Sequence, residues 1–191
     1  MYDFDLQKKL CLEKLYKPDK SRKGNVDEQI IPLIEYINSL KNYYTTSSCS
    51  GRIYLLTEAD KKPDVKWIFV SHEPVNFKEI MHNLNKLPKE RVWFRQENMI
   101  LHVACRAIDD ANKLLKIARD SGFRRSGIIA DSNILIVEIC STEKIDVPIA
   151  YESKLLVNEE YIKFIIDIAN EKFSKGRKKM NTFFSKIKES F

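Results

Sequence analysis

Six consecutive hydroxyl or thiol residues, Thr45 to Ser50, are followed directly by Gly51 and Arg52. A helical pattern precedes this run and a strand pattern follows it. Small polar side chains contribute little apolar area, and each one that is buried without a partner costs about 1–3 kcal/mol. A hydrophobic core has little use for such a run, which therefore indicates either a Ser/Thr-rich turn or a ligand site.

As a ligand site, the run would suit an anion. Hydroxyls and successive backbone N–H groups can converge on the oxygens of a carboxylate or a phosphate. Gly51 would let the backbone approach closely, and Arg52 would offer a planar fork of donors to the same anion. The composition of the run leaves both interpretations open, because a plain turn followed by an arginine has the same residues.

The rest of the chain predicts an α+β fold. Helical periodicity is expected at 4–16, 27–40, 77–87, 109–122 and 158–179, and strands at 53–57, 65–71, 91–94, 99–105, 126–140 (a hairpin) and 145–149. These elements do not alternate regularly, which favours a mixed, largely antiparallel sheet flanked by helices, with a long C-terminal helix. No Gly-x-Gly-x-x-Gly follows a strand, so a Rossmann nucleotide site is not expected.

Three local patterns make sharper predictions. The stretch 65–71 is apolar on both faces apart from Lys66, which is typical of a central strand, with Trp67 and Phe69 sharing one buried face. Asp27 stands where the N-cap of the second helix is expected. Cys49 is expected to be a small thiol filling a tight turn.

Composition bounds the class of protein. With 191 residues and 43% hydrophobic content, the chain can bury a core, and we expect residues 1–170 to form a single α+β domain with 171–191 as a basic C-terminal helical extension. No window reaches the ~18 apolar residues of a membrane span, and the acidic start lacks the features of a leader, which predicts a soluble cytoplasmic protein without membrane partners.

Cysteine spacing and charge limit the possible ligands. Cys11, Cys49, Cys105 and Cys140 are at least 35 residues apart, so no CxxC pair is present and no metal is expected. Of the net charge of +6, +5 falls within residues 171–191. This basic end suits a polyanion such as RNA, and a solvated lysine-rich helix face is the alternative.

Several segments resemble the tRNA methyltransferases that complete the wyosine bases, the third wybutosine-synthesis protein and its archaeal counterparts. The matching segments are Asp19–Glu28, Thr45–Ile53, Trp67–Pro74, Ile100–Arg106, Ala118–Gly127, Val147–Pro148 and Asn158–Ile162. Thr-Ser-Ser-Cys-Ser-Gly-Arg is the most specific of them. This chain departs from the family at Cys140-Ser141-Thr142-Glu143 and at Arg95-Gln96-Glu97-Asn98.

The resemblance implies transfer of a methyl group from S-adenosylmethionine to N4 of a demethylwyosine-type base at position 37, in the anticodon region of tRNA(Phe). Cofactor binding is expected from the hydroxyl-rich run and the two residues after it: Thr46, Ser47, Ser48, Cys49, Ser50, Gly51 and Arg52. The alternative is a noncatalytic tRNA-binding or RNA-binding paralogue on the same scaffold.

Methyl transfer from a sulfonium is an in-line displacement that requires alignment and the removal of one proton. His72, at the end of a strand, and His102, within one, are the candidate catalytic bases, while His82 is expected on a helix surface. The alternatives are a plain strand-end histidine for His72, a hydrogen-bonded core histidine for His102, and water as the base. Phosphate contacts are expected from Lys20, Arg22, Lys23, Arg106, Arg124 and Ser126. Trp67 and Phe69 are expected in the core, and the alternative is an exposed aromatic that stacks on the tricyclic base.

Overall fold

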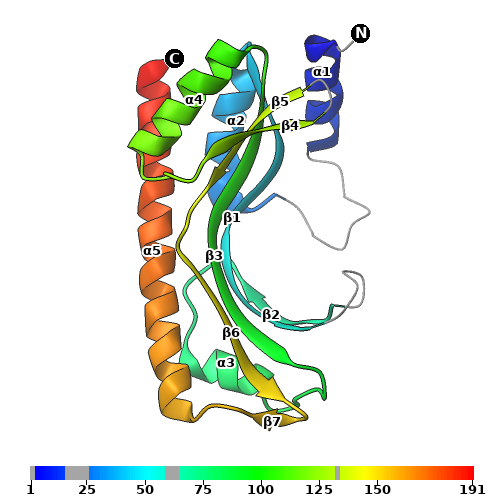
Figure 1. The fold of residues 1–191 in the computed structure, drawn as a ribbon, viewed down its shortest axis with the longest axis vertical. Helices are drawn as coiled ribbons and strands as arrows, with labels where there is room; N and C mark the ends of the chain where they lie inside the picture. Colours follow the sequence, from blue (N-terminus) through cyan, green and yellow to red (C-terminus); the bar gives the residue numbers. More distant parts are fainter. Residues whose placement is uncertain (1–2, 16–25, 59–64, 132–133) are drawn as a thin grey trace. The chain divides into compact units, whose positions relative to one another are not determined.

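The structure is a computed structural model that describes residues 3–15, 26–58, 65–131 and 134–191. Its helices and strands are drawn in Figure 1, and the chain divides into two compact units, each with its own core. Unit 1 comprises Met1–Ser50, Met99–Thr142 and Arg177–Phe191, and unit 2 comprises Gly51–Asn98 and Glu143–Gly176. Three long elements contribute to both units: β1 (Tyr43–Thr57), β3 (Val92–Cys105) and α5 (Glu159–Ser190).

Unit 1 places helices on a sheet whose strand order is β1-β3-β5-β4. Its other elements are α1 (Phe4–Leu15), η1 (Glu28–Ile30), α2 (Ile31–Ser39), α4 (Ile108–Asp120), β4 (Gly127–Asp131) and β5 (Ile134–Cys140). Apolar side chains from α2, α4 and the last part of α5 meet Leu101 and Val103 of β3 in the main core. On α1, Phe4 packs against Tyr44 and Ala104 of the sheet.

Unit 2 has a separate core. Its remaining elements are β2 (Trp67–Ser71), α3 (Phe77–Asn83), β6 (Lys144–Tyr151) and β7 (Lys154–Leu155). Ile53 and Leu55 of β1 and Phe94 of β3 pack against apolar residues of α3 and α5. β1 and β3 form the middle of its sheet, with β2 paired to β1 and β6 paired to β3, both antiparallel.

The predicted central strand is wrong, because β2 lies at the end of the strand order. The prediction that Trp67 and Phe69 share one face is also wrong, because of a bulge in the pairing of β1 with β2. Phe69 pairs with the buried Leu55, but the register then shifts and Trp67 pairs with Leu56. Since directly paired residues share a face, Trp67 and Phe69 lie on opposite faces and not on the same one. Trp67 is 50% exposed, whereas Phe69 packs against the core of unit 2.

The hydroxyl-rich run is also placed differently from the prediction. Thr45 to Ser50 lie inside β1 and form neither a turn nor a loop, and Cys49 is therefore a strand residue. Similarly, the two strands expected at 91–94 and 99–105 are one strand, β3. Antiparallel pairing supplies the backbone partners for these polar stretches, which is why a run without apolar residues can still be part of a sheet.

The α+β class, the largely antiparallel sheet and the long C-terminal helix are confirmed. The helix α5 continues without interruption from Glu159 to Ser190. The division of the chain into a domain of residues 1–170 and an extension of residues 171–191 stays a prediction. In the described part of the chain, no helix is both long enough and apolar enough to cross a membrane.

Gly176 gives a test of the packing in unit 2. A Cβ at this position would lie 2.2 Å from Oδ1 of Asn98. Asn98 is buried and accepts a hydrogen bond of 2.8 Å from Gln96, so its side chain cannot move aside without breaking that bond. We expect Gly176→Ala to lower the free energy of unfolding by about 1–3 kcal/mol in urea denaturation, despite the higher helix propensity of alanine.

Gly127→Ala is the matched control, because a Cβ there meets nothing within 4 Å. It should leave the urea midpoint nearly unchanged. Equal midpoints for the two variants would contradict the packing described for Gly176.

Candidate functional site

The first part of the hydroxyl-rich run is fixed to its neighbours in unit 1. Thr45 is buried and bonded to Asn38 of α2, whose Oδ1 accepts from the Thr45 amide at 2.8 Å. Thr46 Oγ1 donates to the carbonyl of His102 at 3.5 Å, and Ser47 Oγ lies 2.9 Å from His102 Nδ1. Two hydroxyls of the run therefore contact the same histidine.

His102 also contacts an acidic residue on the neighbouring strand. Its Nε2 lies 2.8 Å from Oε2 of Glu138, which is the cross-strand partner of His102 in the β3–β5 register. A carboxylate only accepts hydrogen bonds, so Nε2 carries the proton and Nδ1 accepts from the Ser47 hydroxyl in the neutral ring. The three side chains form a hydrogen-bonded relay that ends at Ser47, a partly solvent-accessible arrangement suited to moving a proton.

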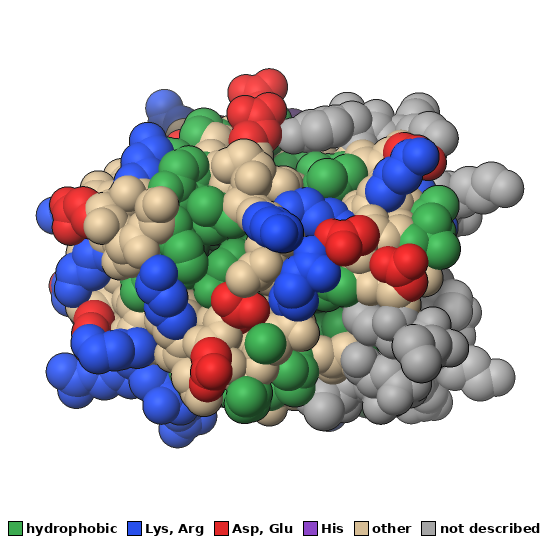
Figure 2. Space-filling model, turned by 90° about the horizontal axis from the view of Figure 1, so that it is seen from above, with side chains coloured by type: hydrophobic (Ala, Val, Ile, Leu, Met, Phe, Trp, Pro, Cys, Tyr) green, Lys and Arg blue, Asp and Glu red, His purple; other side chains and the backbone are tan. Residues whose placement is uncertain are grey.

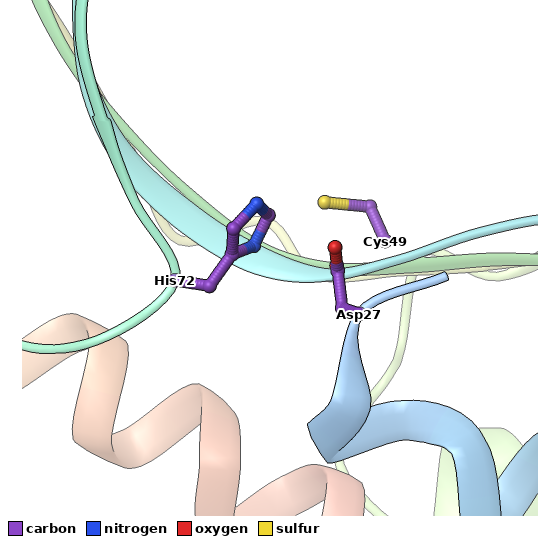
Figure 3. Close-up of side chains that lie close together, drawn as sticks. All are labelled: Asp27, Cys49 and His72. Atoms are coloured by element: carbon purple, nitrogen blue, oxygen red, sulfur yellow. The ribbon is translucent and has the colours of Figure 1, made fainter. Parts of the chain in front are cut away.

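The second part of the run meets Asp27. Its Oδ2 accepts from the Ser50 amide at 2.6 Å, whereas no side-chain capping bond is made to the helix. Asp27 is the N-cap residue of η1, the 3-10 turn that leads into α2, but its carboxylate is directed to β1 and not to the amides of the helix. The side chains of Asp27 and Cys49 approach each other, and a carboxylate oxygen of Asp27 lies within 4.8 Å of Sγ of Cys49 (Figure 3).

Ser50 shows one feature expected of a ligand site. The residue is 4% exposed, and its Oγ has no hydrogen-bond partner among the described residues. A buried hydroxyl of this kind costs stability unless a bound molecule pairs with it. Ser50 thus fits the expectation that the run contacts a polar ligand.

The next residue along β1, Gly51, belongs to unit 2 and has a φ of +105°, which strongly favours glycine. Its carbonyl lies 2.9 Å from Nδ1 of His72, which follows the end of β2. Because a carbonyl only accepts, Nδ1 carries the proton and Nε2 is the basic nitrogen of the neutral ring. The structure therefore fixes the tautomer of His72 through the motif itself.

Arg52 faces away from the core of unit 2. Its Nε and Nη2 bond to Oε2 of Glu97 at 3.4 and 3.2 Å, and its guanidinium lies over the rings of Tyr54 and Trp67 at 4.8 and 5.0 Å. The bonds to Glu97 occupy one edge of the guanidinium. Burial and the neighbouring Glu97 raise the pKa of Tyr54 to about 12, so its hydroxyl stays protonated at neutral pH.

The predicted RNA contacts are placed unequally. Arg106 is held by Asp5 and Asn42 and lies over the ring of Phe4, whereas Ser126 is 2% exposed and accepts a bond from the Cys140 amide. Arg124 is exposed. Lys20, Arg22 and Lys23 lie outside the described residues. The structure does not bring these side chains together with the motif, and their contact with RNA stays a prediction.

Basic side chains also gather toward one edge of the surface drawn in Figure 2. In unit 1, α4 and the end of α5 line an open cavity of about 360 Å³ with Lys113, Lys116 and Lys186. Lys113 donates to the carbonyl of Ser190 and Lys186 to that of Asp120, at 2.8 and 2.7 Å. These lysines therefore satisfy the C-terminal carbonyls of two helices.

Sequence reasoning missed the acidic partners of the site. Glu97 occurs in a segment that departs from the family pattern, Glu138 occurs in the second strand of the expected hairpin, and neither was expected near the motif. The available signal was strand register: once β3 and β5 are paired antiparallel, Glu138 faces His102. That register depends on where the hairpin turns, which the sequence specifies only to within a few residues.

Comparison with known proteins assigns this fold and motif to the tRNA-modifying methyltransferases. The family described as Methyltransferase TYW3 matches residues 6–189, and the chain belongs to that family. The family assignment confirms the resemblance drawn from the motif segments.

Two curated relatives illustrate the match. A Thermococcus sibiricus protein, named tRNA(Phe) 7-((3-amino-3-carboxypropyl)-4-demethylwyosine(37)-N(4))-methyltransferase, is 40% identical over 98% of this chain and 95% of its own length. The Mus musculus tRNA wybutosine-synthesizing protein 3 homolog is 36% identical over 93% of this chain and 71% of its own.

Two solved structures share the fold. A protein from Pyrococcus horikoshii has a TM-score of 0.88 at 40% identity and covers 96% of this chain and 95% of its own. A hypothetical protein from Aeropyrum pernix has a TM-score of 0.72 at 28% identity and covers 85% of this chain and 98% of its own.

The bond between Asp27 and Ser50 can be tested by mutation. Asp27→Ala should lower the free energy of unfolding by about 1–3 kcal/mol, because it leaves the Ser50 amide without its acceptor. Asp27→Asn keeps an acceptor oxygen and should cost less. Urea denaturation of both variants is the measurement, and an alanine variant as stable as the wild type would contradict a structural role for this bond.

Proposed function

We propose that this protein transfers the methyl group of S-adenosylmethionine to N4 of a 7-(3-amino-3-carboxypropyl)-4-demethylwyosine base at position 37 of tRNA(Phe). Membership of the Methyltransferase TYW3 family over residues 6–189 carries the proposal. The motif that the family resemblance rests on is intact, and Asp27, His72 and His102 are each bonded to part of it. Cytoplasmic localisation stays a prediction.

The donor site is proposed along Thr46 to Arg52. Short hydroxyl donors, the buried Ser50 Oγ and the guanidinium of Arg52 together suit the zwitterionic methionine part of the donor. The donor brings its own leaving group, because a sulfonium leaves as a neutral thioether. The displacement calls for no metal, and none is included in the proposal.

Proton removal from N4 is assigned to a histidine. His102 would accept a proton through Ser47, and the Glu138 carboxylate on its other nitrogen would stabilise the imidazolium that forms. His72 is the second candidate, since its tautomer leaves Nε2 as the basic nitrogen. The ring nitrogen that is methylated has its own lone pair, so Cys49 need not act as a nucleophile.

Donor binding tests the first part of the proposal. Arg52→Ala should weaken the binding of S-adenosylmethionine by about 10- to 100-fold in isothermal titration calorimetry, because a charge-assisted hydrogen bond to the carboxylate is lost. Arg52→Lys keeps the charge without the planar fork, and its affinity for the donor should lie between those of the wild type and Arg52→Ala. Wild-type protein that does not bind the donor at millimolar concentration would contradict the proposal.

The catalytic assignment is tested by methyl incorporation into the demethylated tRNA, followed as the mass gain of one methylene unit in the nucleoside. His102→Ala should lower kcat by about 100-fold or more, the usual contribution of general base catalysis, with donor affinity retained, and Ser47→Ala should lower kcat as well. His82→Ala, on the exposed surface of α3, is the control. If His72→Ala is the only one of these variants that lowers kcat, the general base is His72 and not His102.

The alternative of a noncatalytic RNA-binding paralogue makes a distinct prediction. Such a protein would bind tRNA with a steep salt dependence while incorporating no methyl group under any condition that supports donor binding.

A further inference from the structure

One face of the sheet in unit 2 is not covered by the core and carries an ordered row of aromatic and charged side chains. Pairing of the strands places them together: Trp67 lies opposite Leu56, Trp93 opposite Pro148, and Arg95 opposite Asp146. Alternation along β1 and β3 puts Arg52, Tyr54 and Glu97 on this same face, because Ile53, Leu55 and Phe94 point to the core.

These side chains contact one another across the strands. Arg52 links Trp67 and Tyr54 on one side to Glu97 on the other. Arg95 lies 5.3 Å over the ring of Trp93 and bonds to Asp146 at 2.7 Å. The row thus runs from Trp67 on β2 through β1 and β3 to Asp146 on β6.

The row is accessible to a ligand. Trp67 is 50% exposed although Arg52 packs on its ring, and the side chains of Arg95 and Asp146 are 31% and 37% exposed. A large aromatic side chain held at fixed orientation with half of its surface in solvent is a stacking platform for a nucleobase.

We propose that this face binds the target base, with the tricyclic ring stacked on Trp67 and its aminocarboxypropyl chain recognised by Arg95 and Asp146. The inference rests on the proposed function. The chain of the base carries one ammonium and one carboxylate, which complement the aspartate and the arginine respectively. Trp67 on β2 and Arg95 on β3 have only β1 between them, so a tricyclic ring with a three-carbon chain can reach from one to the other.

Three forms of tRNA(Phe) distinguish stacking on Trp67 from recognition of the side chain by Arg95 and Asp146. They carry guanosine, 4-demethylwyosine or the aminocarboxypropyl derivative at position 37. Equilibrium binding is measured by fluorescence anisotropy of end-labelled tRNA at one fixed salt concentration. The wild type should prefer the tricyclic forms over guanosine, and the derivative over 4-demethylwyosine.

Trp67→Ala should lose about 5- to 100-fold in affinity for the two tricyclic forms and little for the guanosine form, because stacking on the extended ring is removed. Trp67→Phe, which keeps a ring, should retain most of the preference. Phe164→Ala removes an exposed aromatic from α5 of the same unit and should change none of the three affinities.

Asp146→Asn should reduce affinity for the aminocarboxypropyl derivative alone, by about 3- to 10-fold, as expected for one partly exposed hydrogen bond. If Trp67→Ala weakens all three forms equally, or none, the stacking site is wrong. If Asp146→Asn acts equally on both tricyclic forms, the assignment of the side-chain contact is wrong.

S-adenosylmethionine also carries an amino-acid group, which this face could recognise as well. Calorimetry with S-adenosylmethionine therefore tests whether the face binds the donor and not the base. Asp146→Asn, which leaves Arg52 and Trp67 in place, should bind the donor as the wild type does, and a parallel loss of donor affinity would overturn the assignment of Arg95 and Asp146 to the base. Absence of methyl incorporation by the wild type would refute the proposed function, whereas unchanged base preference in Trp67→Ala with an active wild type would refute the stacking site alone.

Discussion

Cross-strand pairing of β3 is the constraint on which the chemistry of this protein depends. In unit 1 its pairing with β5 sets His102 opposite Glu138, and in unit 2 its pairing with β6 sets Arg95 opposite Asp146. Each polar pair is on the face away from its core, because the alternate residues of β3, such as Leu101 and Phe94, are fully buried. A shift of one residue would bury the charges and expose the core, so the hydrophobic pattern of β3 also fixes the positions of these polar groups.

The hydroxyl-rich run gains its function from being a strand. As part of β1 its backbone takes part in the sheet, and its side chains are left for specific contacts: Ser47 with His102 in unit 1, and the Ser50 amide with Asp27. The motif then continues into unit 2, where the carbonyl of Gly51 orients His72. In each unit, a group suited to proton transfer is thereby attached to a strand of the sheet, which favours the alignment that methyl transfer needs.

The proposed base-binding face follows from the same geometry. A bulge in the β1–β2 pairing turns Trp67 out of the core and toward Arg52, and Arg52 is in turn held by Glu97. Arginine and aromatic side chains that are already in contact lose little further freedom when a flat ligand binds. Charged groups on this face come in opposite pairs, which suits a zwitterionic group better than a phosphate.

The sequence by itself determined the α+β class, most of the helices and strands, the family and the motif, since these depend on periodicity and on residues close together along the chain. It did not determine that Thr45 to Ser50 form a strand, that β2 is an edge strand with Trp67 exposed, or that the carboxylate of Asp27 binds β1 and not the amides of its helix. Those outcomes depend on strand register and on one bulge, and contacts between residues such as Asp27 and Ser50, 23 positions apart, are fixed only when the chain is folded. Glu138 is the clearest case, because only the β3–β5 register makes it the partner of His102.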